Sequence, residues 1–198
     1  MADARCSPRG ARVLASRGQV AVYRTGKGRI RACNAQRNDV TLANEDLKTL
    51  RFSGEAIARA PVLRIRGNFI AYVYVLIDGD LESVTVQLLN LADPTPRPQV
   101  TEAGFKGFEK VASLRLTIDG TIAWIACWAP PQLINGKGKA CYRTGRRALV
   151  IKARPVGHAI RLREEILDRG QTITPSSLRL RGRTLTWRKA GRRQTAQL

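Results

Sequence analysis

Short stretches of alternating apolar and polar residues run along most of the chain, and glycine-centred turns separate them. Residues 113–124, which read SLRLTIDGTIAW, are typical. An alternation with a period of two places successive side chains on opposite faces of a β-strand. Helical spacing of apolar residues is nearly absent, so the pattern predicts an all-β fold.

The same pattern recurs four times. Each copy predicts a strand, a tight turn at a glycine and a second strand that ends in an aromatic residue. Glycine suits such a turn because it adopts backbone conformations that a residue with a Cβ resists. The copies are residues 13–23 (VLASRGQVAVY), 62–72 (VLRIRGNFIAY), 113–124 and 177–187 (SLRLRGRTLTW).

The turn glycines recur at intervals of roughly 50 to 60 residues, a spacing typical of propeller blades and related arrays. We therefore expect one domain of repeated antiparallel sheets, a small β-propeller-like array of about four units. Its units are residues 11–58, 59–103, 109–170 and 175–198, and the N-terminal segment is a candidate to complete the short last unit. An irregular β-sandwich is the alternative.

Four cysteines stand far apart in the chain, and none forms a C-x-x-C pair. An even number of widely spaced cysteines suits two disulfides in an oxidising compartment. We favour the pairs Cys6–Cys33 and Cys127–Cys141, because each pair flanks its own local unit. Four buried thiols in a cytosolic protein are the alternative.

The chain carries 35 Lys and Arg residues against 15 Asp and Glu, which gives a formal net charge of +20. Such an excess favours an anionic partner such as nucleic acid, an anionic wall polymer or an acidic lipid surface. The arginines are spread along the chain, however, and spread charge usually indicates solvated strand faces, so such faces and Arg-rich composition are the favoured explanation of the charge.

Catalytic and metal-binding motifs are weak. His158 is the only histidine, and no Gly-x-Ser-x-Gly motif is present to partner it. Asp78, Asp80 and Glu82 alternate, but the full spacing of a calcium loop is missing. Glu164 and Glu165 are adjacent, so on a strand they point to opposite faces and favour cross-strand ion pairs over a glycosidase pair. We predict no catalytic residue, no metal site and no cofactor.

The aromatic residues fall into two groups. Tyr72, Trp124 and Trp187 occupy equivalent repeat positions, which favours packing in the core. Trp128 and Tyr142 instead flank an insertion bracketed by Cys127 and Cys141. We predict a ligand-binding surface at this insertion, formed by Trp128, Tyr142, Arg143, Arg146 and Arg147.

Three motifs resemble a group of uncharacterised exported β-propeller-like proteins of high-GC actinobacteria. They are CSPRGA at residues 6–11, DGTIAW at residues 119–124 and SLRLRGRTLTW at residues 177–187. The resemblance covers most of the chain and implies a fold and an exported location. It implies no activity and no functional residue.

We therefore expect a non-enzymatic binding module, secreted or in the cell envelope, whose ligand is an anionic polymer. The opening residues show no signal peptide, and no apolar run reaches membrane-span length. A cytoplasmic nucleic-acid-binding protein is the first alternative, and an enzyme with a loop-assembled site is the second. The oligomeric state is not predicted.

Overall fold

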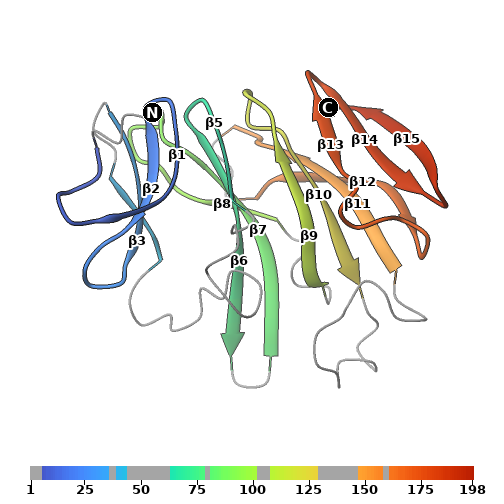
Figure 1. Ribbon diagram of the computed structural model, residues 1–198, viewed down its shortest axis with the longest axis horizontal. Coiled ribbons are helices and arrows are strands. Elements are labelled where there is room, and N and C mark those ends of the chain that lie inside the picture. Colours follow the sequence, from blue (N-terminus) through green and yellow to red (C-terminus); the bar gives the residue numbers. More distant parts are fainter. Residues whose placement is uncertain are drawn as a thin grey trace.

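A computed structural model describes residues 6–35, 39–43, 63–78, 81–101, 108–128, 147–157 and 161–198. These residues form fifteen strands in four antiparallel sheets, so the predicted all-β class is confirmed (Figure 1). No helix among them is long and apolar enough to cross a membrane.

Each sheet is built from strands that follow one another in the chain. The first sheet contains β1 (Arg12–Arg17), β2 (Val20–Arg24), β3 (Ile30–Asn34) and β4 (Val40–Ala43). The second contains β5 (Leu63–Arg66), β6 (Phe69–Asp78), β7 (Leu81–Asn90) and β8 (Gln99–Val100). The third contains β9 (Phe108–Leu116), β10 (Ile122–Trp128), β11 (Arg147–Arg154) and β12 (Arg163–Gly170). The last contains β13 (Arg179–Arg181), β14 (Thr184–Lys189) and β15 (Arg192–Gln197).

The predicted glycine turns join the first two strands of every sheet. Gly18, Gly67 and Gly182 each open a two-residue loop and have φ of 58°, 55° and 56°. A glycine with positive φ in the first loop position is the signature of a type II′ turn, whose twist matches that of the paired strands. The third sheet has a longer turn at residues 117–121, and Gly120 within it has φ of 82°.

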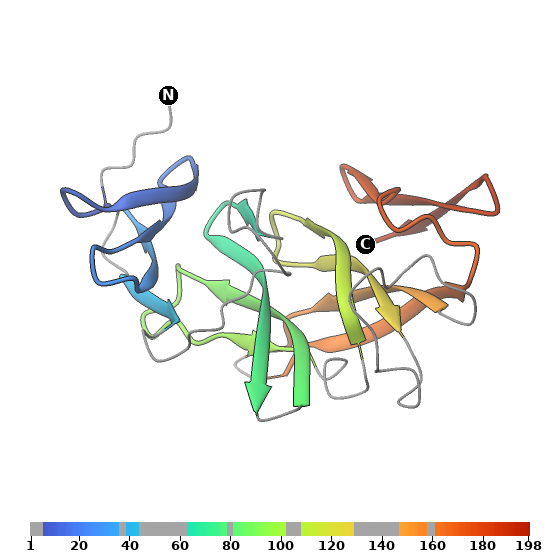
Figure 2. The same cartoon turned by 60° about the horizontal axis from the view of Figure 1, so that its bottom comes forward.

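The sheets stack face to face, and three apolar clusters fill the spaces between neighbouring sheets (Figure 2). Tyr72 lies in the cluster between the first and second sheets, Trp124 between the second and third, and Trp187 between the third and last. All three are at most 4% exposed. The predicted core role of the repeat aromatics is therefore confirmed.

Strand β10 shows why the alternating pattern is so apolar in the middle of the array. Ile122 and Trp124 face the second sheet, whereas Ala123 and Ile125 face the last sheet. A strand whose two faces are both covered needs apolar residues at successive positions, because these point to opposite faces. Residues 121–127 are accordingly all buried.

The four sheets form an open row in both views, with the first and last sheets at opposite ends (Figures 1 and 2). The N-terminal segment packs on the first sheet, where Cys6 and Ala11 contact its buried outer residues. In the described part of the chain the last sheet has three strands, and the N-terminal segment supplies none of them. A propeller-like arrangement and the predicted unit boundaries stay predictions.

Candidate anion-binding site

The glycine turns of neighbouring sheets lie beside one another along the upper edge in Figure 1, which we call the hairpin edge. The turn of the second sheet touches that of the third, because a Cβ on Gly67 would stand 3.5 Å from Ile118. Gly120 is closer still to the second sheet, since a Cβ there would lie 2.7 Å from the ring of Phe69. The ion pair between Arg183 Nη1 and Asp119 Oδ2, at 3.0 Å, joins the last two turns.

Arginines recur on the first strands at this edge. In the first, second and last sheets an arginine stands just before the turn glycine, and in the second and last sheets another stands three residues before it. In the longer turn of the third sheet, the corresponding arginine lies five residues before Gly120. Arg64, Arg115 and Arg179 share the SLR/VLR motif of the repeat. The hairpin-edge arginines are Arg17, Arg64, Arg66, Arg115, Arg179 and Arg181.

Three of these side chains adopt the same conformation. Nη1 of Arg64, Arg115 and Arg179 donates to the carbonyl of the preceding leucine at 2.7, 2.7 and 2.9 Å. Nη2 of Arg115 also donates to the carbonyl of Leu178 at 2.5 Å, which ties the third sheet to the last. The repeat therefore fixes guanidinium groups at equivalent places in three consecutive sheets.

These guanidinium groups repel one another. Burial lowers the pKa of Arg115, and the positive charges of Arg64 and Arg179 lower it further. Among the described residues, none of the six hairpin-edge arginines forms an ion pair with a carboxylate. The edge therefore carries positive charge that the described protein groups leave unneutralised.

The four turns contain one carboxylate, Asp119, and it is already engaged. A hydrogen bond from the Thr117 hydroxyl lowers the pKa of Asp119, as do the Thr121 amide and the Arg183 charge. Asp119 is thus an ionised acceptor that organises its own turn and binds Arg183. It does not neutralise the six arginines.

The insertion surface predicted from sequence is mostly outside the described residues. Tyr142, Arg143 and Arg146 are not described, and neither is the side chain of Trp128. The backbone of Trp128 ends β10 directly opposite Arg147, which begins β11 and is exposed. The structure therefore brings these two positions together, and the rest of that predicted site stays a prediction.

The predicted disulfide Cys6–Cys33 is confirmed, with an S–S distance of 2.09 Å. Cys127 is fully buried and also takes part in a disulfide. Its predicted partner Cys141 lies outside the described residues, as does His158.

The acidic pair on β12 lies as its sequence predicts. Glu165 faces Lys152 across the strands and pairs with it at 3.0 Å, whereas Glu164 stands opposite Ala153 on the other face. In the described part of the chain, no three His, Cys, Asp or Glu side chains are grouped to hold a metal ion.

Sequence reasoning missed the hairpin-edge arginines, although the signal was present. The glycines and aromatic residues define the repeat in the sequence, where the arginine three residues before the glycine looks like part of the spread charge. Only the stacking of the sheets shows that Arg64, Arg115 and Arg179 are neighbours.

No protein-family model, curated protein or solved structure matches this chain.

Proposed function

We propose that this protein is a non-enzymatic binding module that holds an anionic polymer along its hairpin edge. The observation that carries the proposal is a row of six arginines on the first strands of the four consecutive sheets. None of the six has a carboxylate partner among the described residues. Like charges held together lower stability unless a counter-charge is supplied. A polymer with regularly spaced anionic groups supplies it along the whole row.

The chemistry of arginine supports the same partner. Guanidinium keeps its charge at physiological pH and offers planar pairs of N–H donors that fit carboxylate, sulfate and phosphate groups. The carbonyl bonds engage Nη1 of Arg64, Arg115 and Arg179, and in Arg115 also Nη2, and they hold each guanidinium in place. A preorganised donor loses less conformational entropy when a ligand binds.

The disulfide favours an anionic glycan or other cell-envelope polymer over nucleic acid. Cys6–Cys33 forms and persists most readily in an oxidising compartment, where extracellular polymers are the abundant polyanions. On this proposal the protein is secreted or held in the cell envelope, and the stacked sheets form a propeller-like array that presents its hairpin turns to the ligand.

The test replaces the three hairpin-edge arginines that stand directly before a turn glycine. Arg17, Arg66 and Arg181 are all exposed, so the triple variant R17Q/R66Q/R181Q should fold normally. We expect its affinity for polygalacturonate, a carboxylated glycan, to fall at least tenfold. The slope of log affinity against log salt should become shallower by about one for each arginine removed.

A matched control carries the same loss of charge elsewhere. Arg12, Arg169 and Arg193 are exposed and lie away from the turn glycines, so R12Q/R169Q/R193Q should bind nearly as the parent protein does. Equal weakening in both triple variants would show general charge attraction and refute an ordered edge. Tighter binding of a short duplex DNA than of the glycan would refute the glycan assignment. If R147Q loses glycan binding while both triple variants keep it, the insertion surface is the binding site instead.

A further inference from the structure

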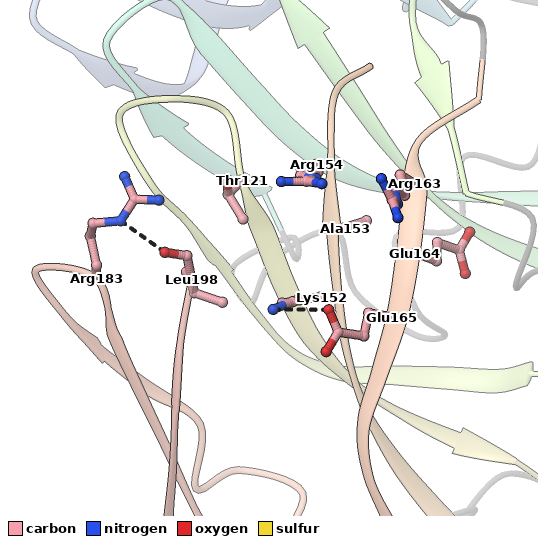
Figure 3. A pocket seen from close by; sticks show the side chains of 9 residues that line it. All are labelled: Thr121, Lys152, Ala153, Arg154, Arg163, Glu164, Glu165, Arg183 and Leu198. Atoms are coloured by element: carbon pink, nitrogen blue, oxygen red, sulfur yellow. Dashed lines mark hydrogen bonds and ion pairs between the residues drawn. The ribbon is translucent and has the colours of Figure 1, made fainter.

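A pocket of about 190 Å³ lies where the third sheet and the last sheet diverge (Figure 3). Strands β11 and β12 form one wall, and the turn and final residue of the last sheet form the other. The polar residues that line the pocket are Thr121, Lys152, Arg154, Arg163, Glu164, Glu165 and Arg183.

Two of the four cations in the pocket are neutralised within the protein. Lys152 Nζ pairs with Glu165 Oε2 at 3.0 Å. Arg183 pairs with Asp119 at 3.0 Å and also donates its Nε to the carbonyl of Leu198 at 2.8 Å. Neither Lys152 nor Arg183 therefore contributes an uncompensated charge.

Arg154 and Arg163 are the other two cations, and they stand directly opposite each other on β11 and β12. Side chains in that relation have Cβ atoms about 4.5–5.5 Å apart, and like charges there are destabilising. Among the described residues, neither guanidinium has a carboxylate partner. Lys152 and Glu165 stand opposite each other in the same way on β11 and β12, two residues away along the same face, and their charges are complementary.

We propose that Arg154 and Arg163 form a clamp for one oxyanion of the phosphate or sulfate type. Two planar guanidinium groups can each donate a pair of N–H bonds to a tetrahedral anion placed between them. In Figure 3 both head groups lie side by side at one rim of the pocket, while the carboxylate of Glu164 points away. The volume suits a single anionic group, either free or at the end of a larger ligand.

This site is independent of the proposed polymer edge. Its two arginines belong to β11 and β12, the third and fourth strands of the third sheet, whereas each hairpin-edge arginine belongs to the first strand of its sheet. The variant R17Q/R66Q/R181Q should therefore still bind an anion in the pocket. A variant that loses the pocket site should still bind the polymer through Arg17, Arg66 and Arg181.

The test is a titration of the disulfide-bonded protein with inorganic phosphate, inorganic sulfate and glycerol phosphate, at constant ionic strength maintained with chloride. We expect the amide signals of residues 152–154 and 163–165 to shift and saturate in nuclear magnetic resonance spectra. The melting temperature should rise with ligand concentration, because ligand that binds only the folded state stabilises it. The variants R154Q and R163Q should each bind about tenfold or more weakly.

R169Q is the matched control, because Arg169 is an exposed arginine on β12 outside the pocket, and it should bind as the parent protein does. Saturation by glycerol phosphate at lower concentration than by inorganic phosphate would identify the end group of an ester as the ligand, and the reverse would identify the free ion. Non-saturating shifts, or equal effects of chloride, would overturn the proposal. If a variant does not fold, the spectra of the parent protein decide the test. Ligand-dependent shifts confined to residues outside 152–154 and 163–165 would then overturn the proposal.

Discussion

The first and last sheets, at the two ends of the array, differ in how their outer faces avoid exposing apolar surface to water. On the first sheet, the outer residues Ala21, Tyr23 and Cys33 are at most 2% exposed, since the N-terminal segment covers them. A disulfide between Cys6 and Cys33 fixes that cover. On the last sheet, no described segment covers the outer face, which consists of polar residues that alternate with buried Leu185 and Trp187. They include Arg179, Arg181, Thr184, Thr186, Arg188, Arg193 and Thr195.

The difference shows that a stacked sheet needs either a cover or a soluble face. Repeat arrays require terminal units with a polar outer surface, because an apolar one would aggregate. The first sheet has an apolar outer face that the N-terminal segment buries, whereas the outer face of the last sheet consists mainly of Arg and Thr. Residues 170–198 contain no Asp or Glu, so the open end is also positively charged.

The largest expected effect comes from removing the packing of the open end. Trp187 is 4% exposed, lies in the cluster between the third and last sheets, and donates Nε1 to Asp168 at 2.8 Å. We expect W187A to lower the free energy of unfolding by about 3–5 kcal/mol. Urea denaturation followed by circular dichroism measures it.

The control for W187A is a substitution on the opposite face of the same sheet. Thr195→Ala changes an exposed residue of β15 and should alter stability by less than about 0.5 kcal/mol. Comparable losses in both variants would mean that the outer face is covered in solution.

A smaller effect is expected from removing the cover of the first sheet. The double variant C6A/C33A loses a cross-link between residues separated by 27 positions, which should lower stability by about 2–4 kcal/mol. Amide hydrogen exchange should accelerate first in β2 and β3 and leave β13 and β14 protected. Uniform acceleration across all four sheets would show that the array unfolds as one cooperative unit.

The smallest effects are expected from pH, and the two ends should respond in opposite directions. Burial raises the pKa of Asp168, but hydrogen bonds from Lys189 at 2.6 Å and from Trp187 outweigh it, so the net pKa is lowered. A lowered folded-state pKa contributes stability above the unfolded value of about 4, and this contribution is lost as pH falls through the folded value. The last sheet should therefore loosen in acid.

The first sheet should be sensitive to alkali instead. Burial and the hydrogen bond from the Tyr23 hydroxyl to Asp39 at 2.9 Å raise the pKa of Tyr23 to about 12. A raised folded-state pKa contributes stability that is present below the unfolded value of about 10 and is lost as pH rises toward 12. Denaturation curves at several pH values, with D168N and Y23F as references, measure both effects. An unchanged acid response in D168N would contradict the first, and an unchanged alkaline response in Y23F the second.

The hairpins and their aromatic cores were predictable from local pattern. Gly18, Gly67 and Gly182 stand where two strands must reverse, and only a residue without a Cβ adopts the required positive φ easily. Tyr72, Trp124 and Trp187 share one repeat position and therefore one kind of burial. The pairing of Cys6 with Cys33 followed from local spacing.

The candidate sites were not predictable in the same way. Arg64, Arg115 and Arg179 are far apart in sequence, and each looks like an ordinary solvated residue of its own hairpin. Arg154 and Arg163 become opposite partners only through the register between β11 and β12. Like charges meet at these places because sheet stacking and strand register, not local sequence, set the distances between them.

The sequence by itself determined the all-β class, the four hairpin turns, the buried aromatic residues and the excess of arginine. Those properties depend on side-chain alternation and on backbone preference, which act over a few residues. The tertiary structure alone decided which arginines share an edge or a pocket, and that the N-terminal segment covers the first sheet. Such placements depend on contacts between segments that are distant in the chain, because burial of apolar faces fixes the sheets relative to one another.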